Sequence, residues 1–437
     1  MHRDELSRRD WLKRAAAAAA VTAGNGRWLH AAEEQASKAI ASVAHVPLRT
    51  ITQGPRFHWM GYYDKLEFDS TNRYVVCNEV PFEHRSPQID DEIKVGMVDT
   101  QDGDRWIDLG ISRAWGWQQG CMLQWRPGGG REVVWNDRVE DQHVCHVLDV
   151  ETRSQRTIPM PIYALSADGR YGVLADFRRI NNMRPGYGYE GLPDPHYDER
   201  APEASGIFRV DLTTGETKLI VSLADIAKIP YPGGDLSDAW HYFNHLLVSP
   251  DSQRFIFLHR WRTDFDPKVG RSRGRFSTRM LTAGMDGSDV RVIDPSGSTS
   301  HFIWRDPEHI CAWTKPIGHD NGFYLFTDKQ GAEPVLVGKQ KMPANGHNTY
   351  LPLPGAEWIL NDTYPDKDRM QTLYLYHVPT DRRVELGRFH SPQVYTGEWR
   401  CDLHPRSSND GMTVAIDSPH TGAGRQVHLL DISSIVG

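Results

Sequence analysis

A pattern of two short apolar strands joined by a polar turn recurs seven times along this chain of 437 residues. Several of the turns are of the Ser-Pro-Asp or Asp-Gly kind, which suit a tight reversal of the backbone. The copies cover residues 64–80, 121–136, 162–177, 245–261, 301–313, 347–363 and 404–418. Such a repeat constrains the fold strongly, because each copy can bury its apolar faces only against its neighbours.

Each copy is followed by an apolar stretch that begins a second, outer hairpin, the last of them at residues 427–431. The strands alternate with period 2 and are rich in Val, Ile, Tyr and Phe. Length alone would suggest two to four domains. Four short strands repeated seven times instead predict an all-β fold, a seven-bladed β-propeller, as a single domain over residues 45–437. The alternative is a β-sandwich or two stacked β-domains, which account less well for the regular spacing.

The third copy is followed by an unusually long connection, which runs from Arg178 to Ala204. A loop of this length is either functional or disordered. It contains the run Arg184-Pro185-Gly186-Tyr187-Gly188-Tyr189, which suits a lid over a ligand site or a packing segment between two blades. An amphipathic helix is expected only at residues 223–229.

The N-terminus has the pattern of an export signal. Ser7-Arg8-Arg9-Asp10-Trp11-Leu12-Lys13 precedes a short apolar stretch, Ala15–Ala23, and resembles a twin-arginine signal. We therefore expect residues 1–35 to be an export signal and linker, and the protein to be periplasmic or secreted. The alternative is a free amphipathic N-terminal helix.

The charge balance narrows the possible partners. The chain has 50 Lys and Arg against 57 Asp and Glu, a net charge of -7, which argues against a nucleic-acid partner. No apolar run is long enough to span a membrane. The five Cys are scattered and predict no disulfide framework. We expect a monomer.

Histidine begins the first strand in four consecutive copies, at His245, His301, His347 and His404. The first strands of a propeller line its central channel, so these side chains should converge. Converging imidazoles form either a divalent metal site or an acid–base cluster. Taken singly, each is more often a hydrogen-bonded core residue. The sequence has no nucleophile elbow, phosphate loop, zinc-type Cys pair or EF-hand.

Several segments resemble the seven-bladed propeller polysaccharide lyases, which are the ulvan lyases and, more distantly, the oligogalacturonate lyases. The resemblance runs from about residue 50 to the end. The segments are Tyr62-Tyr63-Asp64-Lys65, Trp117-Gln118-Gln119-Gly120, Arg184-Pro185-Gly186-Tyr187-Gly188-Tyr189, Phe243-Asn244-His245, Asn361-Asp362-Thr363-Tyr364-Pro365-Asp366 and Asp402-Leu403-His404-Pro405-Arg406.

The resemblance implies metal-assisted β-elimination of a uronic-acid oligosaccharide or polysaccharide, with Mn, Zn or Ca as the divalent ion. It implies His245 as base or ligand, Arg184 as the carboxylate-binding residue and Tyr189 as proton donor to the leaving oxygen. The metal ligands would be His301, His347 and His404. The substrate contacts would be His241, Gln119, Tyr187 and Arg406.

The ulvan-type machinery is incomplete in this sequence. The Arg expected four residues before His245 is His241, and Gln119 and Gln124 lie where a catalytic histidine would be sought. The oligogalacturonate type is therefore the better analogy. Because fold kinship does not determine function, two alternatives remain: a non-catalytic propeller that binds a glycan or a protein, and a hydrolase or other metal enzyme on the same scaffold.

Overall fold

The computed structural model describes residues 41–267 and 275–437. Residues Val43–Gly437 form one compact unit. The expected export signal, residues 1–35, lies outside the described residues. Among the described residues, no helix is both long and apolar enough to cross a membrane.

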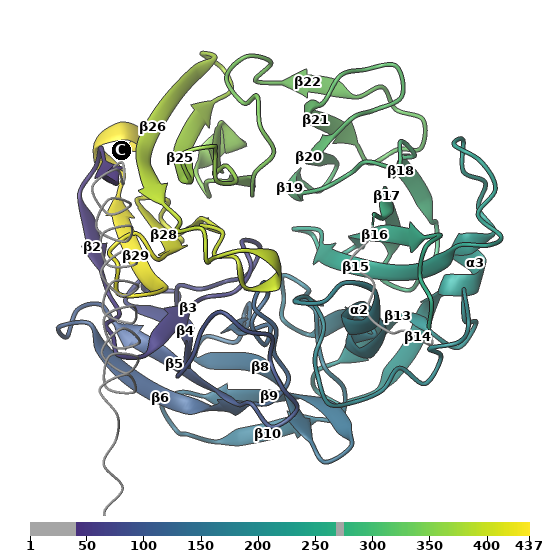
Figure 1. Ribbon diagram of the computed structural model, residues 1–437, viewed down its shortest axis with the longest axis horizontal. Coiled ribbons are helices and arrows are strands. Elements are labelled where there is room, and N and C mark those ends of the chain that lie inside the picture. Colours follow the sequence, from purple (N-terminus) through teal and green to yellow (C-terminus); the bar gives the residue numbers. More distant parts are fainter. Residues whose placement is uncertain (1–40, 268–274) are drawn as a thin grey trace, which may run out of the picture. The chain divides into compact units, whose positions relative to one another are not determined.

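Seven antiparallel sheets are arranged as blades around a common centre, as Figure 1 shows. This confirms the predicted seven-bladed β-propeller. In blades 1 to 3 the strands follow chain order from the centre outward. They are β3 (Phe57–Trp59), β4 (Tyr74–Val80), β5 (Ile93–Asp99) and β6 (Arg105–Ser112); β7 (Gln124–Trp125), β8 (Glu132–Val139), β9 (Gln142–Asp149) and β10 (Gln155–Ile158); and β11 (Ala164–Leu165), β12 (Tyr171–Ala175), β13 (Gly206–Asp211) and β14 (Thr217–Ser222).

Blades 4 to 7 repeat this order. Their strands are β15 (Trp240–Val248), β16 (Arg254–Arg262), β17 (Ser277–Gly284) and β18 (Arg291–Asp294); β19 (Phe302–Asp306), β20 (His309–Thr314), β21 (Gly322–Thr327) and β22 (Val335–Val337); β23 (Thr349–Tyr350), β24 (Trp358–Asn361), β25 (Met370–His377) and β26 (Arg382–His390); and β27 (Arg406–Ser407), β28 (Thr413–Ser418) and β29 (Gln426–Asp431). Two short 3-10 turns, η1 (Pro354–Ala356) and η2 (Gly397–Trp399), and a terminal helix, α4 (Ser433–Val436), complete these blades.

The repeated turn has a repeated hydrogen-bond pattern. Ser166 Oγ donates to Asp168 Oδ1 at 2.5 Å and accepts from the backbone N–H of Tyr171 at 2.9 Å. The turns that begin at Ser249 and Ser408 make the same two bonds, with distances between 2.5 and 3.0 Å. Local side-chain bonds of this kind compete with extended structure and reverse the chain. They explain why the turn sequence marks the blades so clearly.

The N-terminal segment completes the last blade. β2 (Leu48–Thr50) pairs with β29 as its outer strand, and β1 (Val43–Ala44) adds a fifth strand to blade 6 by pairing with β26. The sequence expectation of a seventh outer hairpin beginning at residue 427 was therefore wrong. β29 is followed by α4 and not by a return strand, and residues 48–50 supply the outer strand instead.

The long connection after β12 contains a helix, α2 (Phe177–Met183), where the sequence suggested a loop. Asp176 caps the helix by accepting a hydrogen bond from the backbone N–H of Arg178 at 2.9 Å. The helix was missed because Arg179 and Asn181, both polar, are buried on it beside Ile180. The amphipathic helix expected at 223–229 is present as α3 (Leu223–Ala227).

One end of the propeller carries the starts of the inner strands together with the hairpins that join the second and third strand of each blade. We call this end the site face. It follows from the antiparallel order of each sheet, in which the first strand runs away from this end and the second returns to it. Helix α2 and the connection that contains it lie on the site face, because they join β12 to β13.

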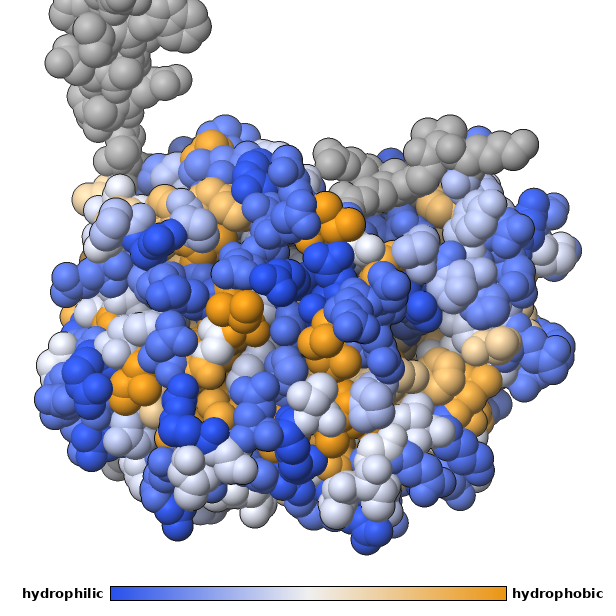
Figure 2. Space-filling view, turned by 90° about the horizontal axis from the view of Figure 1, so that it is seen from below, coloured by the Kyte–Doolittle hydropathy of each residue, from blue (hydrophilic) through white to orange (hydrophobic). Residues whose placement is uncertain are grey.

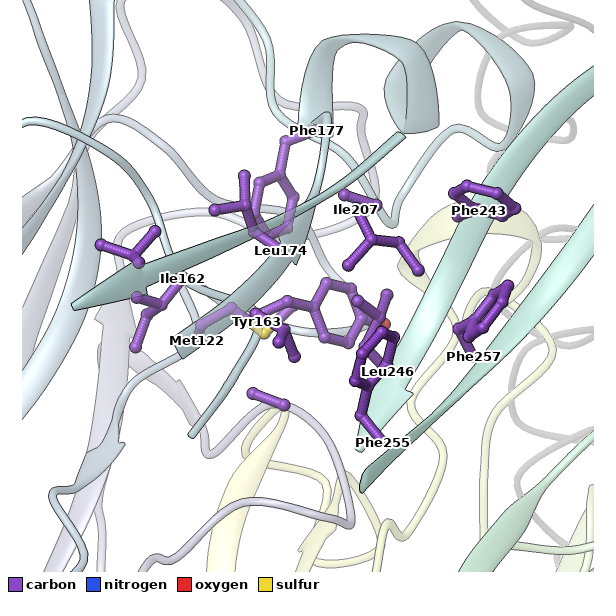
Figure 3. Close-up of a cluster of buried hydrophobic side chains, with 14 of the residues drawn as sticks. Met122, Ile162, Tyr163, Leu174, Phe177, Ile207, Phe243, Leu246, Phe255 and Phe257 are labelled. Carbon is purple, nitrogen blue, oxygen red and sulfur yellow. The ribbon is translucent and has the colours of Figure 1, made fainter. Parts of the chain in front are cut away.

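The largest apolar cluster extends from blade 2 to blade 4. Figure 3 shows Phe177 beside Leu174, next to α2, and Tyr163 extending toward Leu246. The outer surface carries only scattered hydrophobic side chains among hydrophilic ones, as the face in Figure 2 shows. The packed interior therefore lies within and between the blades, which holds the residues near the axis in place.

The closure of blade 7 gives a stability prediction. Ile51 follows β2, is 2% exposed and packs in the cluster that joins blades 7 and 1. Ile51→Ala should lower the free energy of unfolding by about 2–5 kcal/mol, because it leaves a cavity at the closure. Urea denaturation measures this loss. The control, Val43→Ala in β1, removes a side chain that is 47% exposed and should change stability by less than about 0.5 kcal/mol. Equal effects of the two changes would contradict this account of ring closure.

Candidate active site and metal centre

The four histidines in register lie together at the axis. The ring centroids of His301 and His347 are 4.2 Å apart, and those of His347 and His404 are 4.3 Å apart. His245 joins them through Tyr62, whose ring lies 4.9 Å from His245 and 5.1 Å from His404. All four imidazoles are almost fully buried. The repeat therefore brings together residues that are far apart in the sequence.

Local backbone distortion aims two of these rings. His245 is the extra residue of a bulge in β15, where the register with β16 shifts between Asn244 and Leu246. Its φ is 57°, and that of His404 is 42°. A left-handed conformation is uncommon for a residue with a side chain and persists where the surroundings hold it. The bulge takes His245 out of the strand alternation and turns it toward the axis.

Three buried groups are placed to hold a metal ion. One donor atom each from His347, Asp402 and His404 lies within 4.8 Å of the others. His347 Nε2, His404 Nε2 and Asp402 Oδ1 have no hydrogen-bond partner among the described residues. Buried polar atoms are rarely left unsatisfied, and this set of nitrogen and oxygen donors fits a divalent ion. The donor set therefore fits the metal that the resemblance implies.

Neighbouring groups orient these donors. Both carboxylate oxygens of Asp362 lie 3.0 Å from His347 Nδ1, which directs the free Nε2 of that ring toward the cluster. Burial favours the neutral ring, but the Asp362 carboxylate outweighs it and raises the pKa of His347. Arg400 Nε donates to Asp402 Oδ2 at 2.7 Å and so fixes the third donor. A carboxylate behind a ligating histidine is a common feature of metal sites.

His301 lies beside this group rather than within it. Its Nδ1 is 3.0 Å from Asn345 Oδ1, and its Nε2 is 3.5 Å from the hydroxyl of Tyr364. Asp402, to which the sequence analysis gave no role, is the third member of the donor group, and Asp362 supports the group through His347. Both acids lie in segments that carried the family resemblance, but nothing in the spacing assigns them these positions.

Two guanidinium groups, of the buried Arg260 and the partly buried Arg184, have no counter-ion among the described residues. Arg260 is 5% exposed, and its Nε and Nη1 have no hydrogen-bond partner; Arg184 Nη1 has none either. Among the described residues, neither side chain is ion-paired with a carboxylate. Both guanidinium groups lie over the ring of Phe276, at 4.6 and 4.8 Å from its centroid. A buried charge without a partner is costly, so this pair favours binding of an anionic ligand. Arg260 was missed by the sequence analysis, since an Arg on a second strand has no distinguishing signal.

Tyr187 connects the guanidinium groups with the metal-type donors. Its hydroxyl accepts hydrogen bonds from Arg400 Nη2 at 2.7 Å and from Arg184 Nη2 at 3.1 Å. Burial alone would raise its pKa, but the charges of Arg184 and Arg400 outweigh burial and lower the pKa of Tyr187 to about 7. A phenol of this kind is half ionised near neutral pH and can act as a general base.

His245 and Gln119 occupy the blade 4 side of the axis. Burial lowers the pKa of His245 to about 4, although its bond to Asp64 counteracts this. Asp64 Oδ2 lies 3.4 Å from His245 Nε2, which leaves Nδ1 without a partner. Gln119 Nε2 donates to Tyr163 Oη at 2.6 Å, and this same oxygen accepts from the backbone N–H of His245 at 3.0 Å. Both predicted residues thus lie with His301, His347 and His404 in the polar group at the propeller axis, which we call the axial cluster.

Three predicted site residues have other surroundings. Tyr189 stacks on Phe177 at 4.1 Å in the apolar core and accepts a hydrogen bond from Asn136, which does not fit the expected proton donor.

His241 and Arg406 also point elsewhere. His241 Nδ1 lies 2.8 Å from His259 Nε2, because strand alternation turns it away from the axis. Arg406 donates to the carbonyl of Tyr62 and pairs with Glu67 at 2.5 Å, which makes it an internal ion pair. The sequence could not separate these residues from true site residues, because facing direction depends on the bulges.

The comparisons with known proteins agree with the fold. Neither the protein-family models nor the curated protein sequences give a match. Among solved structures, oligogalacturonate lyase from Vibrio parahaemolyticus is similar at a TM-score of 0.60 and 14% identity, over 90% of this chain and 97% of that chain. An oligogalacturonate lyase in complex with manganese gives the same values. The β-propeller domain of the Trilobed protease from Pyrococcus furiosus has a TM-score of 0.48 at 11% identity, over 86% of this chain and 96% of that chain.

Fold and site together define a seven-bladed β-propeller with a polar, largely buried cluster at its axis. The fold is that of the oligogalacturonate lyases, as the sequence resemblance implied. At this level of identity the similarity establishes the fold, and the chemistry has to be argued from the residues themselves.

The donor group predicts metal binding that depends on Asp362. Asp362→Asn should weaken the affinity for Mn²⁺ or Zn²⁺ by about 10–100-fold, because it removes the charge that orients His347. His404→Ala should abolish stoichiometric binding. Isothermal titration calorimetry on chelator-treated protein measures both. The control is His420→Ala, a histidine of blade 7 whose ring lies 4.3 Å from that of His428, outside the donor group. Unchanged affinity in His404→Ala would exclude this metal site.

The charges around Tyr187 predict a titration near neutral pH. Arg184, Arg400 and Asp402 are the charged groups that act on it. The phenolate is present above a pKa of about 7 and is protonated below it. Ultraviolet difference absorbance should show one tyrosinate forming with a midpoint near neutrality, and Tyr187→Phe should remove that step. Persistence of the step in Tyr187→Phe would assign it to another group.

Proposed function

We propose that this protein is a lyase that cleaves uronic-acid-containing oligosaccharides or polysaccharides by metal-assisted β-elimination. One juxtaposition carries the proposal. Three kinds of group adjoin one another at the propeller axis. They are the metal-type donors, the guanidinium groups of Arg184 and Arg260, which have no counter-ion among the described residues, and the phenol of Tyr187, with a pKa of about 7. These are the groups that removal of a proton next to a carboxylate requires. The shared fold with oligogalacturonate lyases supports the proposal.

Arg184 and Arg260 bind the carboxylate of the uronic acid. A guanidinium can hold a carboxylate through two parallel hydrogen bonds, and the free Nη1 atoms of these residues are available for it. Offsetting the carboxylate charge makes the neighbouring C5 proton more acidic, because the negative charge that develops on its removal is stabilised. A divalent ion held by His347, Asp402 and His404, with His301 beside them, would add Lewis-acid stabilisation of that charge.

Tyr187 is the group that moves the proton. Its phenolate takes the C5 proton, the C4–O bond to the next sugar breaks and a C4=C5 double bond forms. The phenol then returns the proton to the leaving oxygen, so that no other reactant is needed. The neutral imidazole of His245, with its pKa lowered to about 4, is a weaker base near neutral pH. We assign it, with Gln119, to hydrogen bonds with the sugar.

The cellular location proposed here is the one that the sequence predicts. We propose that the protein is exported by the twin-arginine pathway and acts in the periplasm or outside the cell. The pattern at Ser7–Lys13 supports this. A polymeric substrate that cannot enter the cytoplasm would suit such a location.

The proposal predicts an unsaturated product. Digests of pectic, ulvan and glycosaminoglycan oligomers should gain ultraviolet absorbance from the new double bond. Tyr187→Phe should reduce kcat about 10²–10⁴-fold, as expected for loss of general acid–base catalysis, and chelation should reduce it further. The matched control is Tyr376→Phe, whose hydroxyl bonds to Asp381 in blade 6.

Two other outcomes would replace the proposal. New reducing ends without the absorbance would indicate a hydrolase. Saturable glycan binding without any product, unchanged in Tyr187→Phe, would indicate a non-catalytic binding propeller.

A further inference from the structure

A cavity opens between blades 2 and 3 on the site face. Its volume is about 240 Å³, and it is lined by residues of the β8–β9 hairpin, the start of α2 and the chain that leads into β13. The segment 184–189 lies between this cavity and the axial cluster. Tyr189 lies within this segment, and its ring is 5.3 Å from that of His143, a cavity residue. Nothing in the proposed reaction uses this cavity.

His143 is the unusual group in the cavity wall. It is 6% exposed, and its Nε2 has no hydrogen-bond partner among the described residues. Burial lowers its pKa to about 4, so the ring is neutral near pH 7 and can donate or accept one hydrogen bond. A buried polar atom left unbonded is unfavourable, and a polar group of a ligand in the cavity would satisfy it.

The guanidinium group in the cavity wall, that of Arg178, is paired with Asp176, and Asp141 adds a further carboxylate. Arg178 donates to Asp176 through Nε at 2.9 Å and Nη2 at 2.7 Å, a two-pronged ion pair. His196 is paired with Glu199 at 2.7 Å. The cavity therefore differs from the axial site, where the described residues offer Arg184 and Arg260 no counter-ion. It favours an uncharged ligand, and no group of three metal-type donors among the described residues lies here.

We propose that this cavity binds one neutral sugar unit. Met160, Leu174 and Phe208 supply apolar walls for the face of a ring, and His143 with the Asp176–Arg178 pair supplies partners for its hydroxyls. Its volume is below the roughly 300–1,000 Å³ of sites for larger ligands, which suits a single ring.

The inference extends the proposed function to a substrate class, and on that point it rests on the proposed function. A glycan that crosses segment 184–189 would place an acidic unit at Arg184 and Arg260 and a neutral unit beside His143. The preferred substrate would then contain both neutral and acidic sugars, rather than uronic acids alone.

Saturation-transfer NMR with neutral monosaccharides (galactose, rhamnose and xylose) and with galacturonate and glucuronate tests the cavity on the full chain. At least one neutral sugar should bind saturably, and His143→Ala should weaken that binding by about tenfold, the equivalent of one good hydrogen bond. Binding of the uronates should be unaffected by His143→Ala and lost in Arg260→Ala.

A second variant covers the case in which His143→Ala does not fold. Leu192→Trp fills the cavity while keeping His143 itself and should also block the neutral sugar, whereas Ile317→Trp, at a site 63% exposed on blade 5, should not. Neutral sugars that fail to bind, or that bind equally well to both cavity variants, would overturn the inference.

The binding data, taken together with the absorbance assay for the unsaturated product, separate the two proposals. Lyase activity without a neutral-sugar site would leave the proposed function standing and remove only this inference. Cavity-dependent binding of a neutral sugar in a protein without lyase activity would remove the proposed function and leave the neutral-sugar site standing.

Discussion

The burial of charge at the axis is the interaction on which the rest of this structure depends. Among the described residues, Arg184 and Arg260 have no carboxylate counter-ion, and His347, Asp402 and His404 keep buried donor atoms unbonded. Each of these groups would be more stable in water. They persist because seven packed sheets surround them and make any outward movement costly. Such an arrangement is stable only in a protein whose scaffold has stability to spare, which is typical of functional sites.

The scaffold supplies that stability through its closure. The outer strand of blade 7 comes from residues 48–50, so that the two ends of the described propeller are joined by a β-ladder. Thr50 and Thr52 add side-chain bonds to His428 and Gln426 across this joint. A closed ring has no free end from which the blades could separate, and the axial residues gain a fixed environment.

The segment 184–189 divides the site face into two regions of different charge. On one side, Tyr187 and Arg184 belong to a cationic cluster that suits a carboxylate. On the other side, Tyr189 packs against Phe177 and His143, next to a cavity whose guanidinium group, Arg178, is paired with Asp176. The segment is not extended: it turns at Gly186, whose φ is 91°, and this turn lets Tyr187 and Tyr189 face different regions. Because the two regions adjoin, the neutral sugar bound in the cavity and the uronic acid at Arg184 would belong to one glycan.

The sequence by itself determined the number of blades, the turns and the convergence of four histidines, because each follows from a short-range pattern repeated at regular intervals. It also singled out segment 184–189, as either a lid over a ligand site or a packing segment between two blades. Only the tertiary structure decided which neighbours these residues have. The bulge at His245, the buried helix α2, the inward ion pair of Arg406 and the apolar packing of Tyr189 all depend on contacts between distant parts of the chain. The same holds for Asp402, Asp362 and Arg260, whose roles come from charge and burial, and these exist only once the ring has closed.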